Sequence, residues 1–338
     1  MAGGGRRMKT FVRSSVVWLV LGLLALGLVN LASNSAFLKI TLLDGHLYGV
    51  PVDIFTQGSR TMLLALGMTL VIATGGVDLS VGSVVAIAGA VCALLLGQGA
   101  SIATTVMAAI GVGALGGMIN GLLVARFQIQ PIVATLILMV AGRGIAQLIS
   151  GGQVIIIEHR AFEFFANGFV FGVPVAPLLV AGLFLVTHFV LRRSAAGLLI
   201  EAVGDNETAS RFAGLAAVRV KASAYVFCGA CAGLTGVLTA ANIRAADANR
   251  AGENAELDAI FAVVVGGTAL TGGRFSILGS FLGALLIQTL ATTMYYRGVA
   301  PAVAPVPKAL LIIAVSLLQS EKLRGMVGGV WARRRAAA

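Results

Sequence analysis

Residues 62–95 read MLLALGMTLVIATGGVDLSVGSVVAIAGAVCALL, two apolar runs joined by TGGVDLSVGS. Both runs are apolar on every face, which is typical of helices in lipid or in a buried bundle. Gly75, Gly76 and Gly82 permit backbone angles that a helix excludes, and Asp78 places a carboxylate beside them. Irregular backbone is tolerated inside a membrane only where protein or water satisfies its amides. The joint therefore indicates a wet pathway or cavity or, with equal weight, a turn at the membrane surface.

The composition of the chain is that of a polytopic membrane protein. Of its 338 residues 58% are hydrophobic and 11% are charged, whereas soluble domains carry about 25% charged residues. The 44 glycines supply small faces through which helices pack in lipid. The net charge of +11 resides in the segments that we expect to be cytoplasmic, and such asymmetry orients membrane proteins. We therefore expect a membrane lipid environment and no nucleic-acid partner.

The apolar runs predict an all-α fold, a polytopic transmembrane helical bundle of about ten spans with both termini cytoplasmic. Residues 1–338 form one transmembrane domain, with a cytoplasmic tail (1–13), a cytoplasmic loop (192–221) and a basic tail (319–338). Eight spans would follow if the short pieces around Asp78 and Gly266 are re-entrant. The first run could also be a signal peptide cleaved near Ala36, but an uncleaved span is favoured because the remaining chain can insert by itself. Residues 33–60 are too charged to cross and are expected outside. The later spans are expected at 62–74, 81–96, 102–125, 131–149, 173–191, 222–241, 258–269, 275–294 and 302–318.

Two predicted spans carry patterns that bear on packing and polarity. Gly113, Gly117 and Gly121 form a small-residue ridge on one helix face. The overlapping GxGxxG match is no dinucleotide site, because no strand precedes it and it lies within an apolar run. Arg143 and Gln147 share a helix face through their i, i+4 spacing, so Arg143 faces a partner or a wet cavity, or extends to the outer interface.

The longest predicted inner loop contains a short helix with a docking face. Asn206 is a suitable N-cap, and Ala209, Phe212 and Ala213 would form a small apolar patch on the helix that follows. Such a helix can dock into a groove on another protein, or it can lie on the membrane surface. The thin apolar face favours docking.

The motifs of enzymes and metal proteins are absent from the sequence. The chain has no GxxxxGK[ST] and no HExxH, and its histidines are scattered singly. Cys92, Cys228 and Cys231 lie in apolar runs, and no second pair or nearby His completes a metal site. We expect no catalytic residue, no metal and no cofactor on this chain. A transporter without an energy source of its own implies a partner that supplies one.

Two glycine-rich segments resemble each other. GGVDLSVGS (75–83) and GGTALTGGR (266–274) share Gly-Gly, Leu, Ser or Thr, and Gly at matching offsets, each before an apolar run. Paired broken segments in two halves of a chain point to a transport pathway, although glycine-rich turns also resemble one another by chance.

The sequence resembles the permease subunits of the ribose-type ABC importers of monosaccharides. The resemblance rests on GMTLVIATGGVDLSVGSVVAIAGA (67–90), NGLLVARFQIQPIVATL (120–136), GRGIAQLISGGQ (142–153), EAVGDNETASRFAG (201–214) and ELDAIFAVVVGGTALTGGR (256–274). The galactofuranose subfamily is the most similar, through DGHLYGVPVDI (44–54), IQPIVATLILMVAGRGIAQLI (129–149) and NIRAADANRAG (242–252). Glu253 and Asn254 depart from the apolar residues expected there, and the basic, Ala-rich tail is not a feature of the family.

The resemblance implies a bacterial inner-membrane permease that translocates a galactofuranose-like sugar and performs no chemistry on it. Its partners would be a cytoplasmic ATP-binding subunit, a second permease chain, identical or homologous, and a periplasmic sugar-binding protein. ATP and Mg would be held by the ATPase subunit. The segment 204–214 matches the helix that occupies the groove of the ATPase.

The resemblance and the polar residues of the spans together give two sets of candidate site residues. The candidate substrate pathway consists of Asp78, Ser80, Asn120, Thr135, Arg143, Gln147 and Gln153. The candidate ATPase-coupling residues are Gly204, Asp205, Asn206, Ala209, Arg211 and Gly214. Each pathway residue could instead bond neighbouring helices together.

The main alternative is a stand-alone secondary carrier or channel for a small polar solute, which would need ion-coupling residues that the spans offer only at Asp78 and Arg143. A non-transporting scaffold has no reason to keep two glycine-broken segments, and a membrane enzyme would need a nucleophile or metal cluster.

Overall fold

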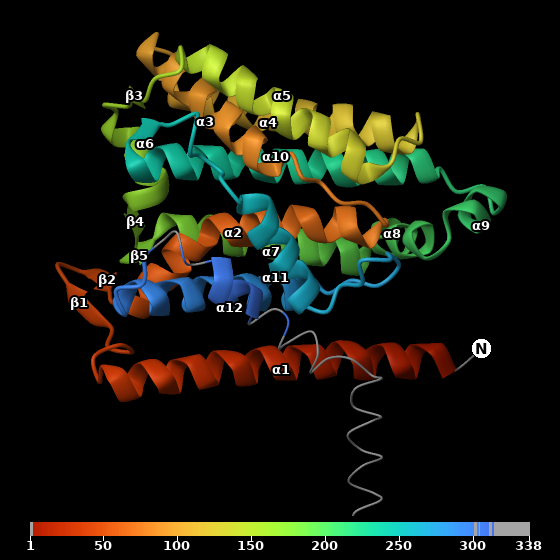
Figure 1. Ribbon diagram of the computed structural model, residues 1–338, viewed down its shortest axis with the longest axis horizontal. Helices are drawn as coiled ribbons and strands as arrows, with labels where there is room; N and C mark the ends of the chain where they lie inside the picture. Colours follow the sequence, from red (N-terminus) through yellow and green to blue (C-terminus); the bar gives the residue numbers. More distant parts are fainter. Residues whose placement is uncertain (1–2, 301–302, 304, 311–312, 314–338) are drawn as a thin grey trace, which may run out of the picture.

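A computed structural model describes residues 3–300, 303, 305–310 and 313, with the backbone alone for residues 3–15. The long helices lie roughly side by side, and most of the connecting segments gather at two ends of the bundle (Figure 1). We call these the strand end, which carries the short strands, and the α8–α9 end, from which α1 also starts.

Helices account for most of the described residues, which confirms the predicted all-α class. The long helices are α1 (Gly3–Ser33), α2 (Val50–Ala73), α3 (Val81–Gly97), α4 (Ile102–Ala125), α5 (Pro131–Ser150), α7 (Val175–Arg193), α10 (Ala217–Ile243) and α12 (Ile277–Tyr296). The shorter helices are α6 (Arg160–Asn167), α8 (Ala195–Asp205), α9 (Glu207–Phe212) and α11 (Ala255–Val265). Three antiparallel pairs join β1 (Thr41–Leu43) to β2 (His46–Tyr48), β3 (Ile155–Ile156) to β6 (Ala245–Ala246), and β4 (Phe169–Val170) to β5 (Val173–Pro174).

Within the described residues, six helices are long and apolar enough to cross a membrane. They are Val16–Ser33 of α1, and α4, α5, α7, α10 and α12. The 17-residue α3 is shorter, and the 24-residue α2 begins with a polar half that contains Asp53 and Arg60. The predicted tenth span (302–318) lies outside the described residues except at 303, 305–310 and 313, and so does the whole tail 319–338.

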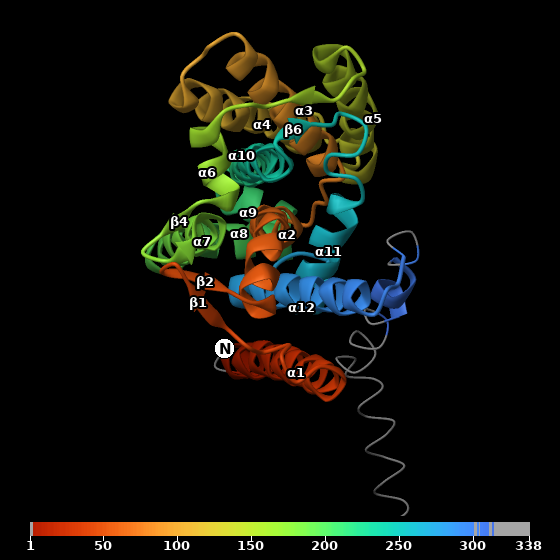
Figure 2. The ribbon, with the colours of Figure 1, turned by 90° about the vertical axis from the view of Figure 1, so that its left-hand side faces the viewer.

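The centre of the bundle is α2, because every residue from Met62 to Ala73 is buried. Viewed along the helices, α2 is surrounded by α7, α10, α11 and α12 (Figure 2). The predicted glycine ridge on α4 packs against α10: a Cβ at Gly113 or Gly117 would overlap the backbone of Gly229 or Tyr225. Small residues thus bring the two backbones into direct contact, as expected for helices in lipid.

Three helices have other bounds than the predicted segments. Residues 50–60, which belong to the polar segment that we expected outside, extend α2, because Pro51 suits the first turn of a helix and Asp53 lies where the helix dipole favours an acid. The predicted span 258–269 is instead the 11-residue α11, which ends at Val265 before a glycine pair. At the N-terminus α1 starts at Gly3, so most of the predicted tail 1–13 continues the helix.

Candidate functional site

The break between α2 and α3 is held by a buried polar cluster that contains four of the predicted pathway residues. The Ser80 hydroxyl donates to Asp78 Oδ1 at 2.6 Å, and the Ser80 N–H donates to the same oxygen at 2.9 Å. From α4, Asn120 Nδ2 donates to Ser80 Oγ at 2.8 Å and to Asp78 Oδ1 at 3.3 Å. Thr135 on α5 is also buried, and its hydroxyl donates to the Pro131 carbonyl at 2.9 Å. Because all four side chains are at most 1% exposed, they fix the shape of the break in this conformation.

The break is also fastened to α10. The Tyr225 hydroxyl donates to the Val77 carbonyl at 3.3 Å, and a Cβ at Gly76 would overlap that same hydroxyl. Glycine is therefore needed at position 76 so that the irregular backbone can lie against the tyrosine. The Val77 carbonyl in this irregular segment therefore has a hydrogen-bond partner inside the protein. A broken helix within a membrane needs such partners, because lipid offers none.

Two further predicted pathway residues hold a loop between β6 and α11. Arg143 Nη1 donates to the carbonyls of Ala248 and Ala251 at 3.0 and 2.7 Å, and Gln147 Nε2 donates to Asn249 Oδ1 at 2.7 Å. The loop thereby approaches the start of α3, where a Cβ at Gly82 would overlap the Gly252 carbonyl. Gln153 is exposed in the turn after α5, apart from the other candidates.

The held loop forms one wall of a cavity that the sequence did not reveal. The cavity has a volume of about 340 Å³, within the ~300–1,000 Å³ of typical ligand sites. It lies between the polar half of α2, the last turns of α10, the loop and α12. Its polar lining consists of Gln57, Arg60, Thr61, Thr235, Thr239, Asp247, Arg250, Glu253, Asp258 and Gln288.

The cavity offers both hydrogen-bond donors and acceptors, and three of its charged side chains have partners within the chain. Asp258 forms an ion pair with Lys308 at 2.7 Å, and Arg60 donates to the Gln57 amide oxygen. Asp247 accepts from the N–H groups of Asn249 and Arg250. Mixed amide, hydroxyl and ionic groups of both signs suit a neutral polyhydroxylated solute, whose hydroxyls donate and accept. The predicted pathway residues Arg143 and Gln147 hold the loop that forms this wall of the cavity.

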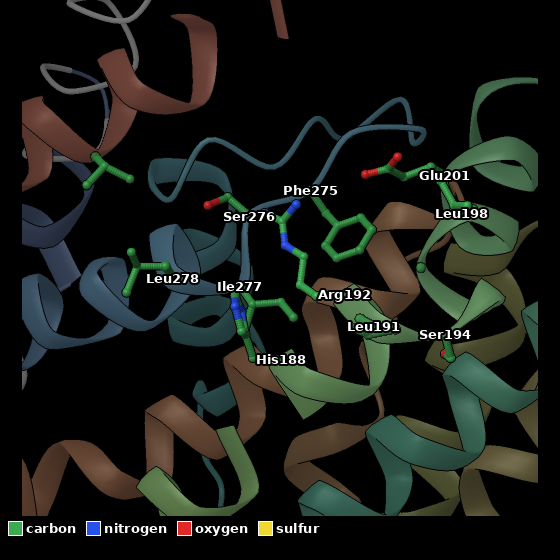
Figure 3. Close-up of a pocket in the computed structure, with 12 residues that line it drawn as sticks. His188, Leu191, Arg192, Ser194, Leu198, Glu201, Phe275, Ser276, Ile277 and Leu278 are labelled. Atoms are coloured by element: carbon green, nitrogen blue, oxygen red, sulfur yellow. The ribbon is translucent and has the colours of Figure 1, made fainter. Parts of the chain in front are cut away.

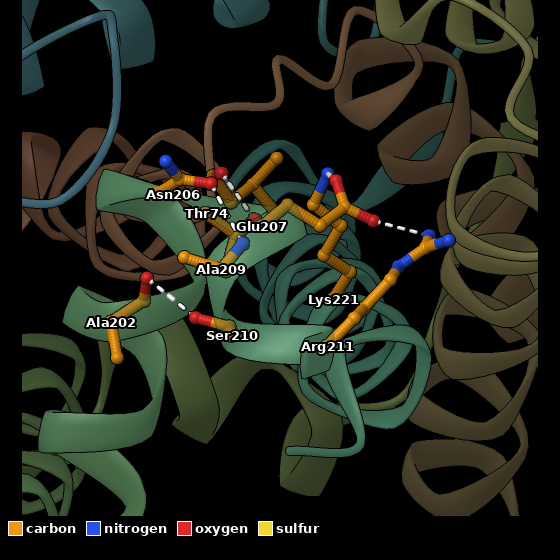
Figure 4. A network of polar contacts seen from close by, with 9 residues as sticks. Thr74, Ala202, Asn206, Glu207, Ala209, Ser210, Arg211 and Lys221 are labelled. Atoms are coloured by element: carbon orange, nitrogen blue, oxygen red, sulfur yellow. Dashed lines mark hydrogen bonds and ion pairs between the residues drawn. The ribbon is translucent and has the colours of Figure 1, made fainter. Parts of the chain in front are cut away.

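At the α8–α9 end the predicted coupling segment 204–214 consists of the last two residues of α8, the whole of α9 and the turn that follows. Asn206 caps α9 as expected, because its Oδ1 accepts from the Ala209 N–H at 2.9 Å. Glu207 forms ion pairs with Arg211 on its own helix and with Lys221 at the start of α10 (Figure 4). Burial favours a raised pKa for the Glu207 carboxyl, but the hydrogen bonds and charges of Lys221 and Arg211 outweigh it and lower the pKa below its ordinary value. This ionic cluster fastens α9 to α10.

The predicted apolar patch of this segment faces away from the bundle. Phe212 is 89% exposed, and Ala209 and Ala213 are exposed beside it. An exposed Phe next to small residues forms an apolar surface that can bind in a groove of another protein. Asp205 and Arg211 are exposed around the patch, and Gly214 ends it with a left-handed backbone angle of φ 81°.

Gly204 links this segment directly to both helix breaks. A Cβ on Gly204 would overlap the Ala73 carbonyl at the end of α2, and would lie 2.6 Å from the Gly273 nitrogen. The Gly273 N–H in turn donates to the Ala73 carbonyl at 2.9 Å, and a Cβ on Gly272 would lie 2.9 Å from the Gly75 nitrogen. We call this meeting of residues 73–75, 204–205 and 272–273 the glycine junction. It brings together the two glycine-rich segments that resemble each other in sequence.

The fold and these sites define a class: a helical membrane protein with two broken segments, a polar cavity and a short helix with an exposed apolar patch has the parts of a transport permease. The chain belongs to the family described as branched-chain amino acid transport system / permease component, whose model matches residues 50–316.

Curated relatives cover most of the chain. The galactofuranose transporter permease protein YtfT of Escherichia coli K12 is 45% identical over 93% of this chain and 92% of its own length. The fructose import permease protein FruF of Bifidobacterium longum is 32% identical over 98% of this chain and 95% of its own length. The ribose import permease protein RbsC of Escherichia coli K12 is 36% identical over 80% of this chain and 85% of its own length. No solved structure matches the chain.

Proposed function

We propose that this chain is the membrane-spanning permease subunit of an ATP-driven importer that carries a monosaccharide, galactofuranose or a similar sugar, across the bacterial inner membrane. The chain performs no chemistry on the sugar. The names of the relatives, which concern galactofuranose, fructose and ribose, support the sugar class. The mixed donors and acceptors of the 340 Å³ cavity support a polyhydroxylated solute.

The observation that carries the proposal is the position of the α8–α9 segment. On one side it contacts both helix breaks through the glycine junction, and on the other it presents the exposed Phe212 patch. A protein that binds the patch can therefore move the breaks. In this proposal the protein is an ATPase subunit, which holds ATP and Mg, while this chain binds no cofactor.

The proposed topology has about ten spans, with both termini and the α8–α9 end in the cytoplasm. The basic residues of that end, among them Arg192, Arg193, Arg211 and Lys221, support this orientation. The strand end then faces the periplasm, where a sugar-binding protein delivers its ligand. A second permease chain, identical or homologous, completes the pathway.

The mechanism is alternating access by rigid-body motion. ATP binding closes the ATPase subunits and displaces α8 and α9, and the glycine junction passes the displacement to the ends of α2 and α3 and to the turn before α12. The polar cluster of Asp78, Ser80 and Asn120 keeps the break intact during the motion, while Arg143 and Gln147 keep the cavity wall in place.

The experiment that tests the function is transport by the reconstituted complex. The chain is co-purified with its ATPase subunit, placed in liposomes with the binding protein outside and ATP inside, and supplied with labelled galactofuranose, ribose or fructose. We expect uptake of one of these sugars that requires ATP. Uptake that proceeds without the ATPase subunit would instead establish a stand-alone carrier.

The coupling role has its own test in the same system. Phe212→Ala should reduce co-purification of the ATPase subunit, because the patch loses its largest apolar group. Phe171→Ala is the matched control, since Phe171 is at least as exposed as Phe212 but lies in the turn between β4 and β5 at the opposite end. Equal recovery of the ATPase subunit with both variants would exclude α9 as the docking helix.

A further inference from the structure

A second cavity opens where α7, α8 and α12 meet. It has a volume of about 310 Å³ and lies at the α8–α9 end, between the last turn of α7, the first turns of α8, the turn before α12 and Val16 of α1 (Figure 3). Its polar lining consists of His188, Arg192, Ser194, Glu201 and Ser276, and its apolar lining includes Leu191, Leu198, Phe275 and Ile277. None of these residues belongs to the sugar cavity or to the polar cluster of the α2–α3 break.

Two opposite charges face this cavity without forming an ion pair. Figure 3 shows the Arg192 guanidinium and the Glu201 carboxylate extending into the same space from α7 and α8. Burial raises the pKa of the Glu201 carboxyl, and the charge of Arg192 partly offsets that increase. Among the described residues, Arg192 and Glu201 make no side-chain hydrogen bond or ion pair, unlike Glu207 with Lys221 nearby. The cavity therefore holds one cation and one anion that a ligand can satisfy.

His188 adds an unsatisfied nitrogen to the same lining. Its Nδ1 atom is buried and has no hydrogen-bond partner in the part of the chain that the structure describes. The ring is stacked on Phe184 with the centroids 5.9 Å apart, which fixes its orientation. A buried polar atom without a partner is costly, so a ligand that hydrogen-bonds to it gains affinity.

An apolar groove continues from the cavity along α7. It shares His188 and Arg192 with the cavity and is otherwise lined by Leu185, Val186, Phe189, Val190 and Arg193. Leu185, Val186 and Phe189 are each at least 60% exposed, so this face of α7 has no protein cover among the described residues. A charged pocket joined to an exposed apolar groove matches a molecule with a zwitterionic head and a hydrocarbon chain.

We propose that this site binds a phospholipid with a phosphoethanolamine headgroup, from the membrane leaflet at the α8–α9 end. The phosphate accepts from Arg192 and His188, the ammonium donates to Glu201, and one acyl chain lies in the groove along α7. The basic end of α7 places the site at the depth of the headgroups. Glu201 repels a purely anionic headgroup, and the quaternary ammonium of choline lacks the N–H groups that the carboxylate accepts.

Native mass spectrometry of the full chain tests the proposal. The purified chain is mixed with equal amounts of phosphatidylethanolamine, phosphatidylcholine and phosphatidylglycerol that have the same acyl chains. We expect one tightly held phosphatidylethanolamine molecule and about tenfold weaker binding of it by Arg192→Ala, the loss typical of one charge-assisted hydrogen bond. Arg219→Ala is the matched control, because Arg219 is exposed in the first turn of α10 and lines neither the cavity nor the groove, so lipid binding by this variant should match the wild type.

A second variant keeps the test independent of folding defects. Glu201→Gln removes the negative charge, so phosphatidylglycerol should then bind as well as phosphatidylethanolamine, and a preserved size-exclusion profile shows that the variant is folded. Equal losses in Arg192→Ala and Arg219→Ala would show unspecific lipid contact and overturn the proposal. It would also be overturned if the wild type bound all three lipids alike, or if the ATPase subunit displaced the lipid, because the cavity would then be a protein-docking site.

Discussion

At the scale of single residues, the polar cavity is lined by side chains whose hydrogen-bonding groups are available to solvent or to a solute. Gln288 contributes an amide from α12, and its hydrogen bond within the chain, to Thr292, is long at 3.4 Å. Its amide is therefore available to a sugar hydroxyl. We expect Gln288→Leu to lower the rate of ATP-dependent sugar uptake about fivefold, through the loss of one neutral hydrogen bond of ~1 kcal/mol.

The control for that measurement is Gln98→Leu, since Gln98 is exposed at the end of α3 and lines none of the described cavities. Uptake rates are compared at equal amounts of reconstituted complex. If both variants transported at the wild-type rate, Gln288 would not contact the sugar.

The ionic cluster of α9 gives a pH dependence whose sign follows from Glu207. The pKa of this carboxyl is lowered in the folded chain, so its stabilising effect is complete above the ordinary value of 4.5 and is lost as the pH falls through the folded value. We expect α9 to stay protected from hydrogen exchange between neutral pH and that value, and to lose protection below it, after correction for intrinsic rates. Glu207→Gln should remove this dependence; an unchanged profile would contradict the role of Glu207.

At the scale of elements, the close packing of α4 on α10 depends on glycine. A Cβ at Gly117 would overlap the Tyr225 carbonyl, so Gly117→Ala must push the two helices apart. We expect a loss of ~1–3 kcal/mol in unfolding free energy, the usual cost of overpacking. The displaced α10 would also carry Tyr225 away from the α2–α3 break.

Gly111→Ala on the same helix is the matched control, because a Cβ at Gly111 meets nothing within 4 Å. It should be neutral, or stabilising by up to ~1 kcal/mol through helix propensity. Thermal unfolding of both variants in detergent measures the difference. A Gly117 variant as stable as the Gly111 variant would show that the α4–α10 contact tolerates separation.

At the scale of the whole molecule, the glycine junction connects the α8–α9 segment with both helix breaks. Gly204→Ala places a methyl group against the Ala73 carbonyl and so separates α8 from the end of α2. We expect this variant to insert and to hydrolyse ATP with its partner, but to transport far less sugar for each ATP consumed. Gly182→Ala on α7, where a Cβ meets nothing within 4 Å, should keep the wild-type ratio. Full coupling in Gly204→Ala would show that force reaches the breaks by another route.

The sequence predicted those features that depend on neighbouring residues. Long apolar runs predicted the helices, the TGGVDLSVGS joint predicted the break after Ala73, and Asn206 predicted the start of α9. It did not indicate that residues 50–60, which were placed outside because of their charge, are part of the helix. The reason is that a helix can carry charged residues on a face that borders a polar cavity. Hydropathy along the sequence does not show which face of a helix borders such a cavity.

By itself, therefore, the sequence determined the all-α membrane class, the α2–α3 break and the short helix that begins after Asn206, because hydropathy and helix capping act over a few residues. Only the tertiary structure decided which polar groups meet. The polar cavity joins Gln57, Thr239, Asp247 and Gln288 from four distant segments, and the glycine junction joins Gly75, Gly204 and Gly272. Such sites depend on which helix faces pack together, and that choice is made by the close approach of backbones at glycine and by burial of the entire chain.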